Sequence, residues 1–177
     1  RVAGVTHWAP ATMPDDMEQG MRETGVWSPP QIDATNAQDQ TNSSLTYGFV
    51  FDFCGVEIDP DTGQTRIDRY VTMHDSGRLL NPLIAEGQIL GSFIQGLGAA
   101  LYEEFVYDEE GNFLSGTFSD YLVPSACEAV EPLILHMETA SPFTPLGAKG
   151  LAEGNCISTP VCLANAVCYA LDIQHIT

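Results

Sequence analysis

The residues best suited to chemistry lie in the run Gly147–Gly154, where a single acid, Glu153, follows small and apolar residues and one lysine. Three glycines in these eight positions would allow positive φ angles and a close backbone approach to another group. A carboxylate held there would lose water, which raises its pKa toward the range where a general base works best. A glycine loop with an incidental surface acid explains the same residues, so this run alone leaves both interpretations open.

A second candidate site lies on a helix that the sequence predicts from about Asn81-Pro82 to about Glu104, with proline in its first turn. Its interior contains Gly87 and three further glycines, each costing roughly 1 kcal/mol relative to alanine. Helical spacing predicts two stripes: one small and amide-bearing (Gln88, Gly91, Gln95, Gly98), and one apolar that would face the core (Leu90, Ile94, Leu97, Leu101). Paired amide donors and acceptors suit a polar ligand. Tight helix packing on the glycines is an equal alternative.

The elements that must position these residues mix strands and helices without a βαβ alternation, which favours an α+β fold. We expect a hairpin, a smaller hairpin, a buried strand and a second helix with a hydroxyl cap and an early proline. The expected ranges are Tyr47–Ile58 and Thr65–Met73 around the turn Asp59–Gly63, then Phe105–Phe113, Leu133–Met137 and Thr159–Leu171.

Length and composition indicate one globular domain with an extension: 177 residues, 44% hydrophobic and 17% charged. We expect residues 1–44 to be an irregular wrapping segment anchored by Trp8 and Trp27, and residues 45–177 to form the main domain. The chain starts with Arg1, which suggests a processed chain or a fragment, and no apolar run approaches the length of a membrane span.

Charge and cysteine content narrow the function further. A net charge of −18 argues against a nucleic-acid partner, because phosphate would be repelled. Five cysteines without a C-x-x-C pair match neither a zinc site nor a disulfide framework, and reduced thiols favour the cytoplasm. The four histidines lack ligand spacing, so no metal-ligating side chain is expected, and His74 is interpreted as a hydrogen-bonded loop histidine.

Three ordered segments, spread over roughly residues 45 to 172, together carry a family resemblance. They are Val56–Gly63 with His74–Pro82, Gly87–Gly98 continuing to Leu101–Glu104, and Gly147–Glu153. The set resembles the C-terminal molybdopterin-binding region of the large (molybdenum) subunit of the xanthine oxidase, aldehyde oxidoreductase and aerobic carbon monoxide dehydrogenase superfamily. The implied fold is part of that superfamily's molybdenum-cofactor-binding domain.

The resemblance implies a role for particular residues. Glu153 matches the general base, which takes a proton from a metal-bound hydroxide while an aldehyde, N-heteroaromatic or similar small substrate is hydroxylated. Gln88 matches a glutamine that hydrogen-bonds the molybdopterin cofactor, and Gly87, Gly91 and Gly150 are assigned to the same cofactor wall. The cofactor would be molybdenum-molybdopterin, in bacterial relatives often the cytosine dinucleotide.

The resemblance also implies what lies elsewhere. The family's pyrophosphate-binding loops and substrate-orienting residues normally lie upstream, so we expect half of a molybdenum site, completed by the remainder of the molybdenum subunit. Iron–sulfur clusters and FAD would sit on partner domains or subunits. Many relatives place glycine before the base and Ser-Pro or Pro-Pro after it, whereas Ala152 and Gly154-Asn155 stand here. A non-catalytic assembly domain and an acidic protein-binding domain are the alternatives.

Overall fold

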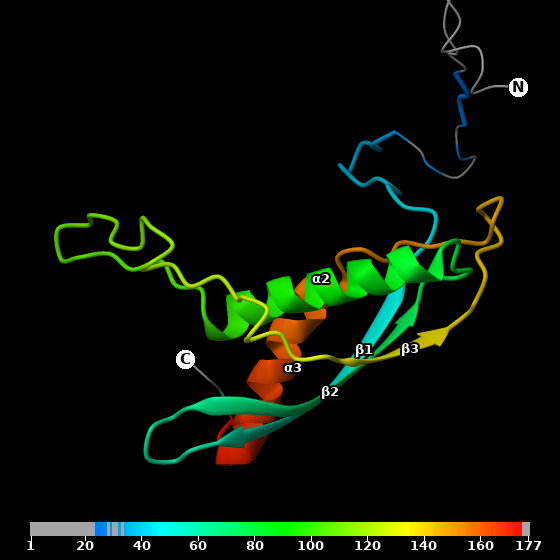
Figure 1. Ribbon diagram of the computed structural model, residues 1–177. Helices are drawn as coiled ribbons and strands as arrows, with labels where there is room; N and C mark the ends of the chain where they lie inside the picture. The colour runs from blue at the N-terminus through cyan, green and yellow to red at the C-terminus, as the bar shows by residue number, and fades with distance from the viewer. Residues whose placement is uncertain (1–23, 28, 30–31, 33, 175–177) are drawn as a thin grey trace, which may run out of the picture. The chain divides into compact units, whose positions relative to one another are not determined.

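The computed structural model describes residues 24–27, 29, 32 and 34–174 and divides the chain into two units, 1–43 and 44–177. Trp8 lies outside the described residues. The described part of the first unit contains turns and neither helix nor strand, and Trp27 is exposed there. The second unit contains three strands and two helices within its described residues (Figure 1). This mixture confirms the predicted α+β class.

A long antiparallel hairpin forms the centre of the sheet. β1 (Phe49–Ile58) pairs with β2 (Thr65–Asp75), with a bulge at Gly55/Val56. The Asp59 carboxylate closes the turn by accepting a hydrogen bond from the Asp61 amide at 2.8 Å. The predicted hairpin is confirmed, although β2 continues two residues past the predicted end at Met73.

β3 (Leu133–Met137) pairs in parallel with β2, so the strand order is β1-β2-β3. The predicted bounds of this strand are confirmed. Its predicted burial is wrong for this chain, because four of its five residues are exposed. The strand lies at the edge of the sheet, with β2 as its neighbour.

Helix α2 (Pro82–Leu101) begins as predicted, with the Asn81 side chain capping the Ile84 amide at 3.2 Å. It ends three residues before Glu104. Its core face consists of Ile89, Phe93 and Leu97, and Leu90 is exposed. The predicted apolar stripe is therefore wrong at Leu90, and the buried face is rotated by about one residue.

Helix α3 (Gly154–Leu171) crosses the sheet beside β1 and packs against α2, as Figure 1 shows. Its predicted start at Thr159 is wrong: the helix begins five residues earlier and contains Pro160 in its interior. Tyr70, Phe93, Leu97 and Leu163 meet in the core between the sheet and the two helices. By length and composition alone α3 could cross a membrane, which the sequence argument did not expect, yet core helices of globular proteins meet the same criteria.

Residues 102–132 connect α2 to β3 without a further helix or strand. At the predicted small hairpin only a single bridge forms, between Tyr107 and Phe113. The Asp108 side chain holds the turn by accepting from the Asn112 amide at 2.7 Å, with Gly111 at φ 83°. The turn is therefore present, but its arms are too short to form strands.

Candidate functional site

Two of the segments identified in the sequence lie side by side. The residues after β2 pair with the glycine run: the Lys149 amide donates to the Ser76 carbonyl at 2.7 Å, and the Arg78 amide to the Gly147 carbonyl at 3.0 Å. Gly77 and Gly147 both have positive φ, at 61° and 73°, where a side chain would be strained. Among the three glycines of the run only Gly147 has this conformation. The predicted positive φ angles are therefore found at one of the three positions.

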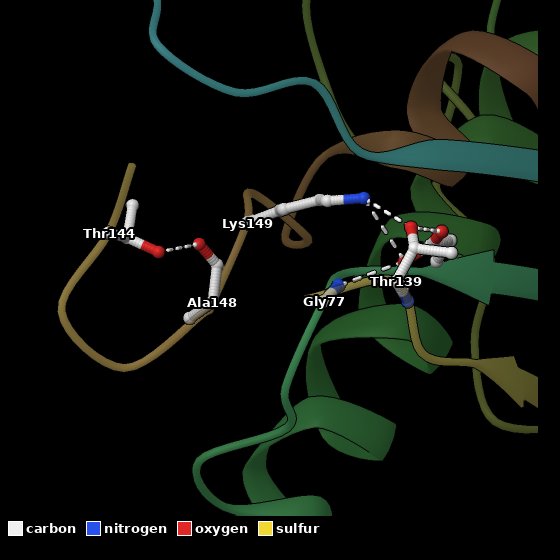
Figure 2. A network of polar contacts seen from close by, with 6 residues as sticks. Gly77, Thr139, Thr144, Ala148 and Lys149 are labelled. Carbon is white, nitrogen blue, oxygen red and sulfur yellow. Dashed lines mark hydrogen bonds and ion pairs between the residues drawn. The ribbon is translucent and has the colours of Figure 1, made fainter. Parts of the chain in front are cut away.

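A buried ion pair fixes this junction (Figure 2). Asp75, at the end of β2, accepts hydrogen bonds from the Thr139 hydroxyl, the Thr139 amide at 3.1 Å and the Gly77 amide at 3.0 Å. Lys149 Nζ lies 3.4 Å from Asp75 and 2.6 Å from the Thr139 hydroxyl. Burial raises the pKa of Asp75, but these hydrogen bonds and the lysine charge outweigh it and hold the pKa at about 2.

Glu153 follows this braced loop directly and is the N-cap residue of α3, with no hydrogen bond from its side chain to the helix. The carboxylate is exposed. The desolvation expected from the glycine run is therefore not provided by this chain, and any loss of water at Glu153 requires a group that covers it.

Glu153 faces α2 across a groove of about 350 Å³, here called the α2 groove. The residues that line it are Gly87, Gln88, Gly91, Ser92, Gln95, Ala152, Glu153 and Cys156. The structure thus brings four of the five predicted site residues together, from segments more than sixty positions apart.

Gly150 is the exception. It lines a second groove, of about 480 Å³, on the β1 side of Glu153, together with Gly48, Phe49 and His74. A Cβ on Gly48 would lie 2.5 Å from the Gly150 carbonyl oxygen, so the two backbones are in close contact. Gly150 therefore does not share the α2 groove with Gln88.

The glycines of α2 fall into two classes. At Gly87 and Gly91 an added Cβ would have no atom within 4 Å apart from its chain neighbours and the nearby backbone of α2 itself. At Gly96 it would lie 2.7 Å from the Asn155 carbonyl oxygen and 2.9 Å from Thr159 Cβ, and at Gly98 it would meet Glu103 and Pro124. The first pair leaves the groove open and the second pair allows tight packing. The predicted stripe is thus wrong at Gly98, which is buried. Tight helix packing holds at Gly96 and Gly98, and the ligand interpretation stays a prediction for Gly87 and Gly91.

Sequence reasoning missed two residues of α3 that lie beside Glu153. Cys156 had been grouped with the unremarkable thiols, yet its Sγ donates to Gln95 Oε1 at 3.2 Å and to the Ser92 carbonyl at 3.6 Å. Burial first, and then the charge of Glu153, raise the pKa of the Cys156 thiol. The second is Asn155, which had been noted only as a departure from the family pattern. Asn155 lies one helical turn before Thr159. A correctly placed helix start would therefore have put both Asn155 and Cys156 in the first turn of α3.

Asn155 is fully buried and belongs to a polar network between α3 and the sheet. Its side-chain amide contacts His74 Nε2 at 2.8 Å, Thr72 Oγ1 at 3.0 Å and both Asp52 oxygens at 3.2 and 3.3 Å. His74 thus lies at the buried end of β2 and not in a loop, although it is hydrogen-bonded as expected. Burial lowers the pKa of His74, and the hydrogen bond between His74 and the Asn155 side-chain oxygen opposes this shift.

Comparison with known proteins gives the family. The model of the molybdopterin cofactor-binding domain matches residues 2–130, which include α2 and Gln88. The chain belongs to this family. Specifically, it is a molybdopterin-binding region of the xanthine oxidase family, as the resemblance implied. The glycine run and Glu153 lie beyond the matched residues.

Relatives are molybdenum-dependent oxidoreductases and their subunits. The 6-hydroxypseudooxynicotine dehydrogenase complex subunit gamma of Paenarthrobacter nicotinovorans is 43% identical over 71% of this chain and 16% of its own length. The carbon monoxide dehydrogenase large chain of Afipia carboxidovorans is 37% identical over 78% of this chain and 17% of its own. Reconstituted CO dehydrogenase from Oligotropha carboxidovorans superposes with a TM-score of 0.74 at 32% identity, covering 94% of this chain and 20% of that one.

The chain therefore spans less than a fifth of the length of these two curated relatives. This chain, with its sheet, α2 and α3, therefore corresponds to only one part of such longer subunits. The established conclusion is that this chain is a molybdopterin-binding domain of a molybdenum hydroxylase family member.

Proposed function

We propose that this chain forms one wall of the active site of a molybdenum hydroxylase, with Gln88, Gly87 and Gly91 against the cofactor and Glu153 as general base. The observation that supports the proposal is the α2 groove, which is lined by an exposed carboxylate, an exposed amide and two glycines where an added Cβ would meet nothing beyond the local backbone of α2. Gly150, on the other side of Glu153, would contribute through the backbone of the loop that holds the base.

The groove residues fit a pterin. The Gln88 and Gln95 amides both donate and accept, which matches the alternating donors and acceptors of a pterin ring. The open space over Gly87 and Gly91 would admit a flat group against the helix backbone, and a Cβ at either position would project into it. Glu153 lines the same groove, and in this proposal the cofactor's reactive end would lie beside it.

Glu153 would do the proton chemistry of the reaction. When bound, the cofactor supplies a two-electron oxidation that this chain's side chains cannot perform. The positive end of the α3 dipole favours negative charge at its N-cap, the position that Glu153 occupies. Because its oxygens are not used in capping, they are free to take the proton released as the substrate is attacked. Closure of the site over Glu153 would provide the desolvation that this chain lacks.

The uncovered face of the sheet supports a larger assembly. Side chains of β1 that point away from α3, namely Phe49, Phe51 and Phe53, are 57%, 55% and 68% exposed. Met73 and Leu135 lie on the same face by register. Neighbouring exposed aromatic and aliphatic side chains of this kind are typical of a surface that binds another polypeptide. We propose that the remainder of the molybdenum subunit covers it, and that iron–sulfur and FAD subunits complete the electron path.

The substrate class proposed is an aldehyde, an N-heteroaromatic compound or a similar small molecule with an electron-poor carbon. The cofactor is proposed as molybdenum-molybdopterin, with or without the cytosine dinucleotide, and the complex as cytoplasmic. A non-catalytic assembly domain remains the second candidate because Glu153 is exposed in this chain. It differs in predicting a groove that takes no cofactor.

Metal analysis of the full-length molybdenum subunit, purified with its partners, separates the two. The expected result is about one molybdenum atom and one pterin per subunit, together with oxidation of a panel of aldehydes and N-heteroaromatics by a dye acceptor. Protein without molybdenum, from cells that load a control molybdoenzyme fully, would favour the assembly domain and contradict the proposal.

A further inference from the structure

The first turn of α3 is held in an unusual way. Its N-cap residue, Glu153, makes no capping hydrogen bond, and no acid lies in its first turn. The turn is held by the side chain of Asn155, which points from α3 toward the sheet and hydrogen-bonds to side chains of β1 and β2. Gly154 packs beside it, because a Cβ there would lie 2.6 Å from Val50 Cγ2 and 3.4 Å from the His74 ring.

Chemistry fixes the orientation of the Asn155 amide. The Asp52 carboxylate is an acceptor, so the Asn155 Nδ2 group must face it and donate. Asn155 Oδ1 therefore faces His74, and His74 Nε2 must carry the hydrogen for the 2.8 Å contact. Each polar atom of the Asn155 side chain is used, and reversing the amide would place its oxygen against the Asp52 carboxylate.

The same network reaches the next turn of α3. The Tyr70 hydroxyl contacts Asp52 Oδ2 at 2.6 Å and Thr159 Oγ1 at 3.1 Å. Asp52 is thus the shared acceptor for Asn155 and Tyr70, and two successive turns of one helix face are tied to it. A buried network with all its members paired favours a single arrangement of the elements it joins.

On its other side, Asn155 packs closely against the backbone of α2. The Asn155 carbonyl oxygen lies where a Cβ on Gly96 would be, 2.7 Å away. Asn155 is thus enclosed between the backbone of α2 and the side chains of β1 and β2. Since Glu153 is two residues before it, the position of Asn155 sets where the carboxylate stands relative to Gln88.

We propose that Asn155 is a positioning residue for Glu153: its buried amide, held by Asp52, Thr72 and His74, fixes the first turn of α3 and so the place of the base across the α2 groove. This inference rests on the proposed function of Glu153. In place of the proline that often follows the base in relatives, this chain uses a side-chain amide to fix the exit from Glu153.

The test uses the full-length, cofactor-loaded protein with Asn155→Ala, Asn155→Asp and the exchanged pair Asp52→Asn/Asn155→Asp. Asn155→Asp sets two carboxylates against each other, whereas the exchanged pair restores one donor and one acceptor at that contact. Ser115→Ala is the matched control, because Ser115 is buried, accepts one hydrogen bond from the Val106 amide at 2.9 Å and belongs to the segment between α2 and β3.

We expect both single variants to lower kcat per molybdenum by about 10- to 100-fold with a smaller change in KM, because a displaced base loses alignment. The exchanged pair should return kcat to within about threefold of its value in the unaltered protein. Amide hydrogen exchange in residues 151–158 of the cofactor-free protein should rise in the single variants and fall again in the exchanged pair. Ser115→Ala should change stability without changing kcat per molybdenum.

Two outcomes would overturn the inference. One is normal kcat per molybdenum in Asn155→Ala, with loss confined to stability. The other is an exchanged pair no more active than Asn155→Asp. A dead Glu153→Gln variant beside fully active Asn155 variants would refute the positioning role and leave the proposed base in place, whereas an active Glu153→Gln variant would refute the base itself.

Discussion

The two classes of glycine on α2 allow a sharp test of the cofactor wall. Gly91 and Gly96 lie five residues apart on the same helix, and each can be changed to alanine. On helix propensity alone, both changes would stabilise the protein by about 1 kcal/mol. The structure predicts that they differ, because their surroundings differ.

At Gly91 the added methyl group would meet no atom within 4 Å beyond its chain neighbours and the nearby backbone of α2. Cofactor-free protein with Gly91→Ala should therefore be more stable by about 1 kcal/mol. In the proposal the pterin lies over this position, so the same methyl group would hinder it. We expect less molybdenum and pterin per subunit after purification, although the polypeptide itself is more stable.

Gly96→Ala is the contrasting variant. Its methyl group would meet the Asn155 carbonyl oxygen at 2.7 Å and Thr159 Cβ at 2.9 Å, so α3 must move. Overpacking of this kind destabilises by about 1–3 kcal/mol, which exceeds the propensity gain. We expect lower stability with and without cofactor, and lower kcat because the turn that carries Glu153 is displaced.

The assay is urea unfolding of the cofactor-free full-length protein, paired with molybdenum and pterin analysis of the protein as purified. Gly91→Ala with higher stability and undiminished cofactor content would mean that nothing lies over Gly91. Gly91→Ala with lower stability in the cofactor-free protein would mean that polypeptide from the rest of the subunit covers it. Either result would refute the assignment of the α2 groove to the cofactor.

Two further predictions concern single side chains. Because its folded pKa of about 2 is below the ordinary 3.8, Asp75 stabilises the fold above about pH 4 by up to about 2 kcal/mol, and this is lost as the pH falls toward 2. Asp75→Asn should flatten the acid limb of stability against pH, whereas exposed Asp68→Asn should not. Gln88→Ala should weaken cofactor binding by about 1 kcal/mol, measured as cofactor lost during dialysis, without lowering the stability of the cofactor-free protein. Gln64→Ala is the control, and equal cofactor retention in the two variants would remove Gln88 from the cofactor wall.

The sequence predicted well where structure depends on neighbouring residues. The turn at Asp59 and the cap at Asn81 define their elements locally, and both were located correctly. The start of α3 was missed because it depends on Asn155, whose partners are supplied by strands about eighty and a hundred positions away. Local signals at Thr159 and Pro160 favoured a later start, and tertiary contacts overrode them.

The site was predicted in part for the same reason. Glu153 and Gln88 share a groove because the loop before α3 pairs with the end of β2, a contact that the sequence does not reveal. Gly150 could not be separated from the other glycines, since which groove it lines depends on the backbone contact with Gly48. The exposure of Glu153 depends on surfaces outside this chain, so the predicted desolvation remains tied to the completed site.

The central claim is that Glu153 is the base of a molybdenum site, and turnover of Glu153→Gln tests it most directly. The amide keeps the shape of the side chain but cannot accept the proton, so kcat per molybdenum should fall by at least about 100-fold. Molybdenum content and stability should stay close to those of the unaltered protein, because the side chain makes no capping bond. Near-normal turnover in a fully loaded Glu153→Gln protein would contradict the account.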